Sequence, residues 1–428
     1  MPFCPALLVR QIFPDRTLPD IAGTVRRELD QAGFASRPKP GGRIAIGVGS
    51  RGISNLAVIV RAVVDYWKSA GMRPFLFPAM GSHGGATAEG QAGVLAHFGI
   101  TAATMDCPIV SSLEVVQLGK TADGIATSMD RSAFESDGVM LIGRVKWHTD
   151  FSGKIESGLY KMMAIGLGKL DGAQRYHTYG HKIGLERVIL SVGRQVLASG
   201  KILGGLAILE DAYHHTACLS AVPVEVMEEK ELELLEVVKS WMGRIPVPEF
   251  DILIMDEVGK NISGAGMDTK VVNRSMYGNY NAWGPGPNIE RIFVRDLSEM
   301  TYGNAVGFGL SDIVTDRLVS KIDWKVTLIN SLTASTPNSI RTPIHFPSDR
   351  ACLETIWVTV GKFEQNTVSY VWIRNTLDLT PLVISENLRD GVERNPLLEI
   401  VKQARELEFD AAGNLAAWWD QDRPKFRS

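Results

Sequence analysis

Short apolar runs alternate with amphipathic stretches along the chain from about residue 41 onward. The apolar runs have the length of buried strands, and the amphipathic stretches have the period of helices. The predicted strands are Arg43–Ser50, Arg73–Met80, Gly138–Ile142 and Leu203–Leu209, and the predicted helices run from Ser54 or Asn55 to about Ala70 and from Thr87 to Phe98. Strands that alternate with helices favour βαβ units, in which helices flank a parallel-type sheet on both faces. We therefore predict an α/β fold.

The second half of the chain predicts a second unit of the same class. The charged run Glu225–Trp241 predicts a helix, and Arg244–Phe250, which contains two prolines, predicts a linker. The elements predicted beyond it are strands at Phe250–Asp256, Ile289–Val294, Ala305–Gly309 and Lys325–Asn330, and a last helix at Leu397–Leu407. We expect two α/β lobes, residues 1–248 and 249–428, with the active site in the cleft between them and the last helix packing back on the first lobe.

The composition narrows the classes of function. The 428 residues include 45 Lys and Arg against 48 Asp and Glu, and the basic residues form no stripe, so a dedicated nucleic-acid binder is excluded. No apolar run is long enough to span a bilayer, and the N-terminus lacks the pattern of a secretory signal. The four cysteines include no CxxC pair, which argues against a disulfide framework. These features predict a reduced, soluble, cytoplasmic protein.

Two histidines follow predicted strands, at the edge where α/β sheets bind ligands. His83 lies in MGSHGGAT (80–87), where small neighbours leave backbone N–H groups available to an anion. His148 lies in GRVKWHTDFSGK (143–154), and Asp150 is close enough in sequence to orient it. Each histidine has either the role of a general acid or base near neutral pH or a structural role in its loop.

A glycine-rich stretch joins two further candidates, Lys161 and His177. The run ESGLYKMMAIGLGK (156–169) has too many glycines for an ordinary core helix, so it predicts a helix leading into a turn where backbone approaches a ligand. His177 and His181 are spaced i, i+4, which on a helix presents both to one metal, but the glutamate of an HExxH motif is missing. No Walker A sequence occurs, and the spacing of GVGSRG (47–52) differs from GxGxxG.

The segments GSHGGAT (81–87), VKWHTDFSGKIESGLYKMMAIGLGK (145–169) and RYH (175–177) together resemble the nickel-pincer lactate racemase family. The resemblance spans about residues 43–184 in order, with weaker traces in the second lobe. It implies two α/β lobes and an isomerase that inverts the hydroxyl-bearing carbon of a 2-hydroxy acid, lactate or a larger acid such as a sugar acid. It also implies a nickel-pincer nucleotide, which is a nicotinic-acid-derived mononucleotide with two sulfur-containing arms, and cofactor-maturation proteins as partners.

The resemblance assigns roles to individual residues. It implies that His83 and His148 take and return the hydroxyl proton while a hydride moves from the substrate to the pincer and back to either face. Lys161 corresponds to the lysine linked to the cofactor through a thioamide, and His177 corresponds to the nickel ligand. A nitrogen donor with soft sulfur arms suits a square-planar nickel ion. Ser82 and Gly84, the neighbours of His83, are expected to contact the cofactor.

The expected substrate contacts are Arg51, Lys260, Glu257 and Trp147. Arg51 resembles the family's carboxylate-binding arginine, since a guanidinium binds a carboxylate bidentately. Glu257 stands near the position where the lactate enzyme has an amide side chain, and Trp147 precedes the second histidine. Both changes favour a longer or polyhydroxylated acid over lactate.

Several alternatives stay open at the level of the sequence. The step from His148 to the linked lysine is longer than in the lactate enzyme, so Lys154 is a rival to Lys161. A second class of enzyme is a metal-dependent hydrolase or lyase that uses His177, His181 and a carboxylate. A third reading is a two-lobed binding protein for small acids, in which the histidines only hydrogen-bond the ligand. The oligomeric state is also open, a homo-oligomer included.

Overall fold

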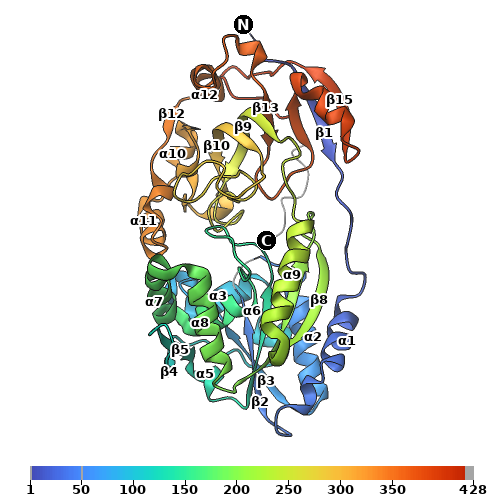
Figure 1. Cartoon of the computed structure of the whole chain (residues 1–428), viewed down its shortest axis with the longest axis vertical. Helices are drawn as coiled ribbons and strands as arrows, with labels where there is room; N and C mark the ends of the chain where they lie inside the picture. Colours follow the sequence, from blue (N-terminus) through green and yellow to red (C-terminus); the bar gives the residue numbers. More distant parts are fainter. Residues whose placement is uncertain (1, 50–51, 420–428) are drawn as a thin grey trace. The chain divides into compact units, whose positions relative to one another are not determined.

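The structure is a computed structural model that describes residues 2–49 and 52–419, and it divides the chain into two compact units (Figure 1). The central unit is Asp15–Met242, and the terminal unit combines Met1–Pro14 with Gly243–Arg427. This division differs from the expected lobes 1–248 and 249–428. Strand β1 (Ala6–Gln11) pairs with β14 (Leu382–Ser385) and β15 (Leu398–Arg405), both in the terminal unit. The central unit is therefore inserted between the first strand of the terminal unit and the rest of it.

The central unit is built on a five-stranded sheet of order β3-β2-β6-β7-β8, in which β8 is antiparallel to β7 and the other neighbours are parallel. Its strands are β2 (Arg43–Val48), β3 (Arg73–Pro78), β6 (Gly138–Arg144), β7 (Ile202–Glu210) and β8 (Thr216–Pro223), with a separate hairpin of β4 (Val115–Lys120) and β5 (Ala126–Asp130). Its helices are α1 (Ile21–Gln31), α2 (Leu56–Ser69), α3 (Ala88–His97), α4 (Ala102–Met105), α5 (Arg131–Phe134), α6 (Leu159–Lys161), α7 (Leu167–Ile183), α8 (Leu185–Leu197) and α9 (Met227–Trp241).

Different helices cover the two faces of the central sheet, as the side chains of β2 illustrate. Successive strand residues point to opposite faces. Ile44, Ile46 and Val48 pack into a cluster with α1 and α2, whereas Ala45 packs into the opposite cluster with α7, α8 and α9. Figure 1 shows α7 and α8 to the left of β2 and β3 and α1 and α2 to their right. The predicted α/β class is confirmed, and the four strands predicted for this half are found with small shifts at their ends.

The terminal unit has an eight-stranded sheet of order β12-β11-β10-β9-β13-β14-β1-β15. The first five strands in this order run parallel, and β14, β1 and β15 pair antiparallel. Its remaining strands are β9 (Glu249–Val258), β10 (Asn288–Leu297), β11 (Ile313–Thr315), β12 (Ile344–Phe346) and β13 (Tyr370–Ile373), and its helices are α10 (Asp316–Ser320), α11 (Trp324–Thr333), α12 (Asp349–Ile356) and α13 (Arg389–Arg394).

Two predicted strands of the terminal unit are absent. Lys325–Asn330 lies in helix α11, whose N-cap Asp323 accepts a hydrogen bond from the backbone N–H of Val326. A short apolar run fits a buried strand and a helix equally well, so its period did not distinguish them. Ala305–Gly309 forms a turn instead of a strand, because Gly307 adopts a φ of 103°, in the left-handed region.

The predicted last helix is also wrong, since Leu397–Leu407 contains the edge strand β15. Leu398 and Ile400 are half-buried while Glu399 between them is exposed, which is the two-residue period of a strand with one covered face. β15 pairs with β1 through Arg10 and Glu399, which also form an ion pair of 3.2 Å. Its exposed side chains are mostly polar, as is usual for an edge strand.

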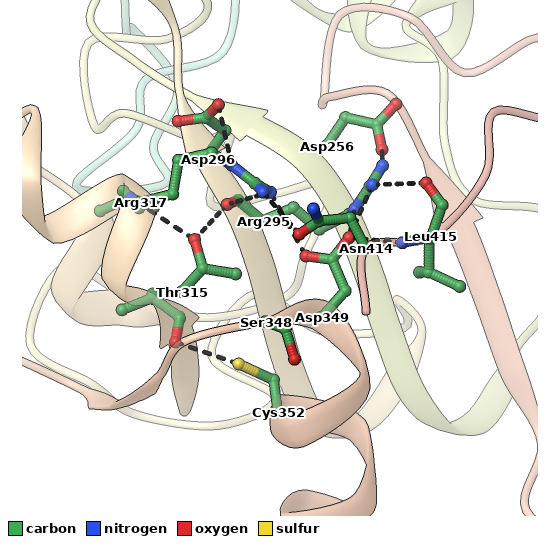
Figure 2. A network of polar contacts seen from close by, with 12 residues as sticks. Asp256, Arg295, Asp296, Thr315, Arg317, Ser348, Asp349, Cys352, Asn414 and Leu415 are labelled. Carbon is green, nitrogen blue, oxygen red and sulfur yellow. Dashed lines mark hydrogen bonds and ion pairs between the residues drawn. The ribbon is translucent and has the colours of Figure 1, made fainter. Parts of the chain in front are cut away.

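A buried ionic network holds the end of the described chain to the terminal sheet (Figure 2). Arg295 of β10 lies between Asp256 of β9, at 2.5 Å, and Asp349 of α12, at 2.8 Å. Leu415 donates its backbone N–H to Asp349 (2.8 Å) and accepts from Arg295 at its carbonyl (2.9 Å). Trp419 donates its indole N–H to the other oxygen of Asp256 (3.1 Å). Among the helices of residues 2–49 and 52–419, none has the length and apolar character that a membrane span requires.

Candidate functional site

The two candidate histidine loops leave the central sheet on either side of β2. In the register of the sheet, Val48 at the end of β2 is paired with Pro78 of β3 and with Ile142 of β6. The chain moves from β2 to β3 on one side and later returns to β6 on the other side. The carboxyl ends of β2 and β6 are therefore the switch point, where open α/β sheets form a ligand crevice.

His83 lies in the loop after β3, just before the 3₁₀ turn Gly84–Ala86. Ser82, His83 and Gly84 are all half-buried. Gly84 has a φ of 63°, and a Cβ atom there would lie 2.3 Å from the carbonyl carbon of Gly90 in α3. This position requires glycine, because any side chain would collide with the helix that follows the loop. The local sequence thus fixes a tight path for the His83 loop.

Lys169 ties the start of the same loop to helix α7. Its side chain is fully buried, and its Nζ donates to the carbonyl of Pro78 (2.9 Å) and to Oε1 of Gln91 (2.6 Å). Gln91 in turn donates to the carbonyl of Gly81 (2.9 Å). Burial lowers the pKa of Lys169, and Asp130, at 3.7 Å from Nζ, acts in the opposite direction. The φ of Lys169 is 54°, so this anchor coincides with a kink inside α7.

His148 follows β6 and is buried, with 6% of its surface exposed. Its Nδ1 accepts a hydrogen bond from the backbone N–H of Asp150 (3.0 Å), which places the proton of the neutral ring on Nε2. The ring stacks on Phe151 with centroids 4.5 Å apart. Glu156 accepts from the backbone N–H groups of His148 (2.5 Å) and Gly153 (3.2 Å). A carboxylate on the same loop therefore holds the histidine's own backbone in place.

Lys161 and His177 lie on one helical stretch, in which α6 continues through the π-helical turn η3 (Met162–Gly166) into α7. The pKa of His177 is lowered, mainly by burial and then by the Lys161 ammonium, whereas the Asp150 carboxylate acts in the opposite direction. Lys161, His177 and Asp150 are therefore close enough to interact. A lowered pKa keeps His177 neutral at pH 7, which is the form that binds a metal.

Lys154, the rival to Lys161, has different surroundings. It is exposed and lines a groove of about 1060 Å³ with Glu186 and Arg187, and none of the candidate histidines lines this groove. Its backbone N–H is bound by Glu186 (2.6 Å). The Lys161 ammonium, in contrast, lowers the pKa of His177. The geometry within the central unit favours Lys161 as the partner of His177.

Arg51 lies outside the described residues, but the loop that follows it is held firmly. Arg144 at the end of β6 donates to Oε2 of Glu210 at the end of β7 (2.5 Å) and to the carbonyl of Gly52 (2.9 Å). The second oxygen of Glu210 accepts the backbone N–H of Ser54 (2.8 Å). An ion pair between two neighbouring strands thus anchors the chain immediately after position 51.

The remaining predicted substrate contacts are divided between the units. Trp147 is buried beside His148 in the central unit. Glu257 and Lys260 belong to the terminal unit, at the end of β9 and just after it. Glu257 accepts from the side-chain amide of Asn375 (3.1 Å), and the Lys260 ammonium donates to the carbonyl of Gly264. Their expected roles toward a substrate stay predictions.

The alternative metal site at His177 and His181 receives no support within residues 2–49 and 52–419. The side chains there that come close enough to share an ion in a group of three are Asp15, Asp211 and His215. Asp15 and His215 are exposed, and buried Asp211 already accepts backbone N–H groups from Arg16 (3.2 Å) and from His215 (2.9 Å). Close acidic groups of this kind are common on protein surfaces without a metal, and this one involves neither predicted histidine.

The sequence analysis missed Glu156, Glu231 and Lys239, which touch the elements that carry His148 and Lys161. One signal was available for Glu231. It occupies the stripe of α9 whose other members, Met227, Leu234, Leu235 and Val238, are buried. A carboxylate among apolar positions at helical spacing calls for a buried partner.

No family model and no curated protein matches the sequence. Comparison of the fold finds the apoprotein of lactate racemase from Thermoanaerobacterium thermosaccharolyticum, with a TM-score of 0.48 and 13% identity over 83% of this chain and 96% of that chain. It also finds a protein from Thermotoga maritima, with a TM-score of 0.49 and 12% identity over 76% of this chain and 84% of that chain. Both TM-scores are low, so these similarities do not assign a function to this chain.

Proposed function

We propose that this protein is a racemase or epimerase that inverts the hydroxyl-bearing carbon of a 2-hydroxy acid with a nickel-pincer nucleotide. The observation that carries the proposal is the strand order β3-β2-β6. The loops with His83 and His148 flank the strand that Arg51 follows, and the helical stretch after the His148 loop carries Lys161 and His177. Inversion requires proton transfer on each side of one carbon beside a carboxylate anchor, and this order of loops supplies such groups.

The side chains present fit the proposed cofactor. Lys161 supplies an amine for the covalent link, and His177 supplies a neutral imidazole nitrogen for nickel on the same helical stretch. Gly49, at the end of β2, brings backbone close to this stretch, since a Cβ atom there would lie 3.5 Å from Sδ of Met162. When bound, the pincer would accept a hydride from the substrate carbon and return it.

The proton transfers are assigned to the two histidines. In the proposed reaction one imidazole would take the hydroxyl proton on one face of the substrate, and the other would supply a proton to the oxygen on the opposite face. In its neutral form His148 presents Nε2–H, which can donate a hydrogen bond to the substrate oxygen. To give up a proton from Nε2, His148 must carry a hydrogen on both nitrogens, and to take one at Nε2 it must carry its hydrogen on Nδ1. In either role the Asp150 N–H must therefore release Nδ1.

The substrate's carboxylate is assigned to Arg51, because a guanidinium binds a carboxylate bidentately. Glu257 stands near the position where the lactate enzyme has an amide side chain, and Trp147 precedes the second histidine, so we propose a substrate longer than lactate and rich in hydroxyl groups. Trp147, beside His148, would offer an apolar face to the carbon chain of such a substrate.

The test uses the full chain produced together with cofactor-maturation proteins. Intact mass and peptide mapping should locate an adduct on Lys161, and metal analysis should give about one nickel per chain, as a single site requires. Inversion is then followed by chiral chromatography on lactate and on a panel of sugar acids. An unmodified chain without nickel and without inversion would overturn the proposal, and binding of the acids without turnover would favour the small-acid binding protein.

Substitution of the histidines separates catalysis from binding. His83→Ala and His148→Ala should each lower turnover at least ~100-fold, the usual share of a positioned acid or base, with substrate binding changed much less. His97→Ala, at the end of helix α3, is the matched control and should keep the parent turnover. Parent-like turnover in both site variants would show that the assignment is wrong.

A further inference from the structure

Helix α9 contacts the two segments that carry Lys161 and His148. Its buried stripe contains Glu231, and its edge carries Lys239, about two turns further along. Glu231 reaches the first turn of α6, and Lys239 reaches the loop that follows β6. In the sequence, α9 resembles an ordinary charged surface helix and lies more than sixty residues beyond both segments.

Glu231 caps the helix that ends in Lys161. The first N–H groups of a helix have no partner within the helix, and the N-cap residue here is Gly158, which has no side chain to offer. The Glu231 carboxylate takes that place by accepting at Oε2 from the backbone N–H of Tyr160, at 3.0 Å. A Cβ atom on Gly158 would lie 2.4 Å from Oε1 of Glu231, so the absence of a side chain at Gly158 leaves room for this close approach.

Lys239 completes a second clamp, on the loop of His148. Glu156, whose side chain is fully buried, accepts from the backbone N–H groups of His148 and Gly153. Lys239 lies 3.0 Å from Oε1 of Glu156 and also donates to the carbonyl of Gly153 (3.3 Å). A buried carboxylate without a counter-charge is strongly unfavourable, so the Lys239 ammonium stabilises the Glu156 carboxylate that holds His148.

We propose that Glu231 and Lys239 are positioning residues, through which helix α9 holds the cofactor lysine and the acid/base histidine of the same site in register. This inference rests on the proposed function for the roles of Lys161 and His148. The contacts themselves are independent of it. Neither residue touches the reacting groups, so their effect is on the placement of Lys161 and His148 and not on chemistry of their own.

The first experiment measures backbone amide exchange in the full chain, without regard to activity. Lys239→Met should speed exchange at His148 and Gly153, and Glu231→Ala should speed it at Tyr160. Each change should be about fivefold or more, as expected for the loss of one net hydrogen bond. Glu231→Gln, which keeps one acceptor oxygen, should lie between Glu231→Ala and the parent and serves if Glu231→Ala fails to fold.

The matched controls lie on the exposed face of the same helix. Lys230 pairs only with its helix neighbour Glu233 among the contacts of the described residues, at 2.7 Å, and Glu229 is exposed. Lys230→Met and Glu229→Ala remove the same groups without touching either clamp. Exchange in the clamped segments that is the same in Lys239→Met and Lys230→Met would overturn the inference for Lys239, and the corresponding match of Glu231→Ala with Glu229→Ala would overturn it for Glu231.

The second experiment uses the loaded enzyme. Misplacement of a reacting group by about 1 Å can cost roughly 100-fold in rate, so we expect Lys239→Met and Glu231→Ala to lower kcat by roughly 10- to 100-fold with KM within about twofold. Lys239→Arg, which keeps the charge, should recover most of the loss. Glu231→Ala should also lower the fraction of chains with an adduct on Lys161.

The two proposals fail in different ways. A parent protein that has no adduct and inverts no acid contradicts the proposed function, while the exchange data still show whether α9 clamps the two segments. Normal exchange in the variants together with a working parent enzyme contradicts only the role of α9. A kcat loss in Lys239→Met that Lys239→Arg does not recover would also count against positioning by the charge.

Discussion

Buried charges bind backbone in both units, but the segments that they hold differ. In the central unit Glu156, Glu231 and Lys169 hold the His148 loop, the start of α6 and the His83 loop. In the terminal unit the network of Arg295 and Asp349 holds the last described segment of the chain, around Leu415. The physical device is the same, and only the first set of segments carries candidate reactive groups. A buried ionic network therefore marks a segment whose position matters, and the chemistry of that segment decides whether it belongs to a site.

The largest expected effect on stability comes from removing the carboxylate at the centre of the terminal network. Asp349→Ala leaves Arg295 and Arg317 without this carboxylate and the N–H of Leu415 without its acceptor. We expect a loss of about 3 to 5 kcal/mol in the free energy of unfolding of the terminal unit. The measurement is urea denaturation followed by the fluorescence of Trp419, whose indole belongs to the network.

The control for this change is Glu354→Ala on the same helix. Glu354 is half-exposed and lies 3.9 Å from Arg350, so its removal should change the free energy of unfolding by less than about 0.5 kcal/mol. Proposed inversion activity should fall in Asp349→Ala only in step with the folded fraction. A selective loss of turnover in fully folded Asp349→Ala protein would show that this network belongs to the site. It would contradict the claim that only the segments held in the central unit carry reactive groups.

The second prediction concerns pH and the buried carboxyl of the central unit. Burial raises the pKa of Glu231 from 4.5 to about 7. A raised carboxyl pKa leaves full stability below the ordinary value and removes it as the pH rises through the folded value. Between pH 4.5 and 7 this group should therefore cost about 3 kcal/mol of stability.

Glu231→Gln removes this titration. We expect the free energy of unfolding of the parent relative to Glu231→Gln to fall as the pH is raised from 4.5 to 8, whereas the parent relative to Glu229→Gln should stay level. Denaturation of the full chain at four pH values measures both differences. If the difference in the free energy of unfolding between the parent and Glu231→Gln stays constant across this pH range, the raised pKa of Glu231 is refuted.

The third prediction, with the smallest expected effect, tests which charged side chains lie near His177. It needs no cofactor. The Lys161 ammonium lowers the pKa of His177 and the Asp150 carboxylate raises it. Lys161→Met should therefore raise this pKa, and Asp150→Asn should lower it, as measured by NMR titration of the imidazole C–H signals. Lys154→Met is the control and should leave the titration unchanged. A larger shift in Lys154→Met than in Lys161→Met would reverse the choice between the two lysines.

Patterns within short stretches of sequence predict the central strands of the sheet in the central unit. Strands such as β2 and β6 are continuous apolar runs between turn residues, so they were found from the sequence. Helix α11 was predicted as a strand because its apolar run is short, and β15 was predicted as a helix because an exposed edge strand has a weak period. The pairing of β1 with β14 joins residues at opposite ends of the chain, which no local pattern encodes.

The candidate site divides in the same way. Lys161 and His177 were predicted from one contiguous stretch, and the structure places them close enough to interact. The groups that hold them come from distant segments, since Glu231 binds the N–H of Tyr160 from 71 positions away and Lys169 binds Pro78 from 91 positions away. The position of Glu231 within an apolar stripe of α9 indicates that its carboxylate has a buried partner. The pattern does not show that this partner is the backbone N–H of Tyr160.

The insertion of the central unit also has a consequence for the order in which the protein is made. β1 is synthesised before the central unit, whereas its partners β14 and β15 are synthesised after it. Residues 15–242 are contiguous and can fold while translation continues, because domains generally fold as units from the N-terminal side. Until β14 and β15 are synthesised, the apolar strand β1 has no partner strand and lies N-terminal to a folded central unit. A nascent chain stalled before β14 thus carries a finished central unit and an open strand, which makes the late stage of synthesis the interval most exposed to aggregation and to chaperone binding.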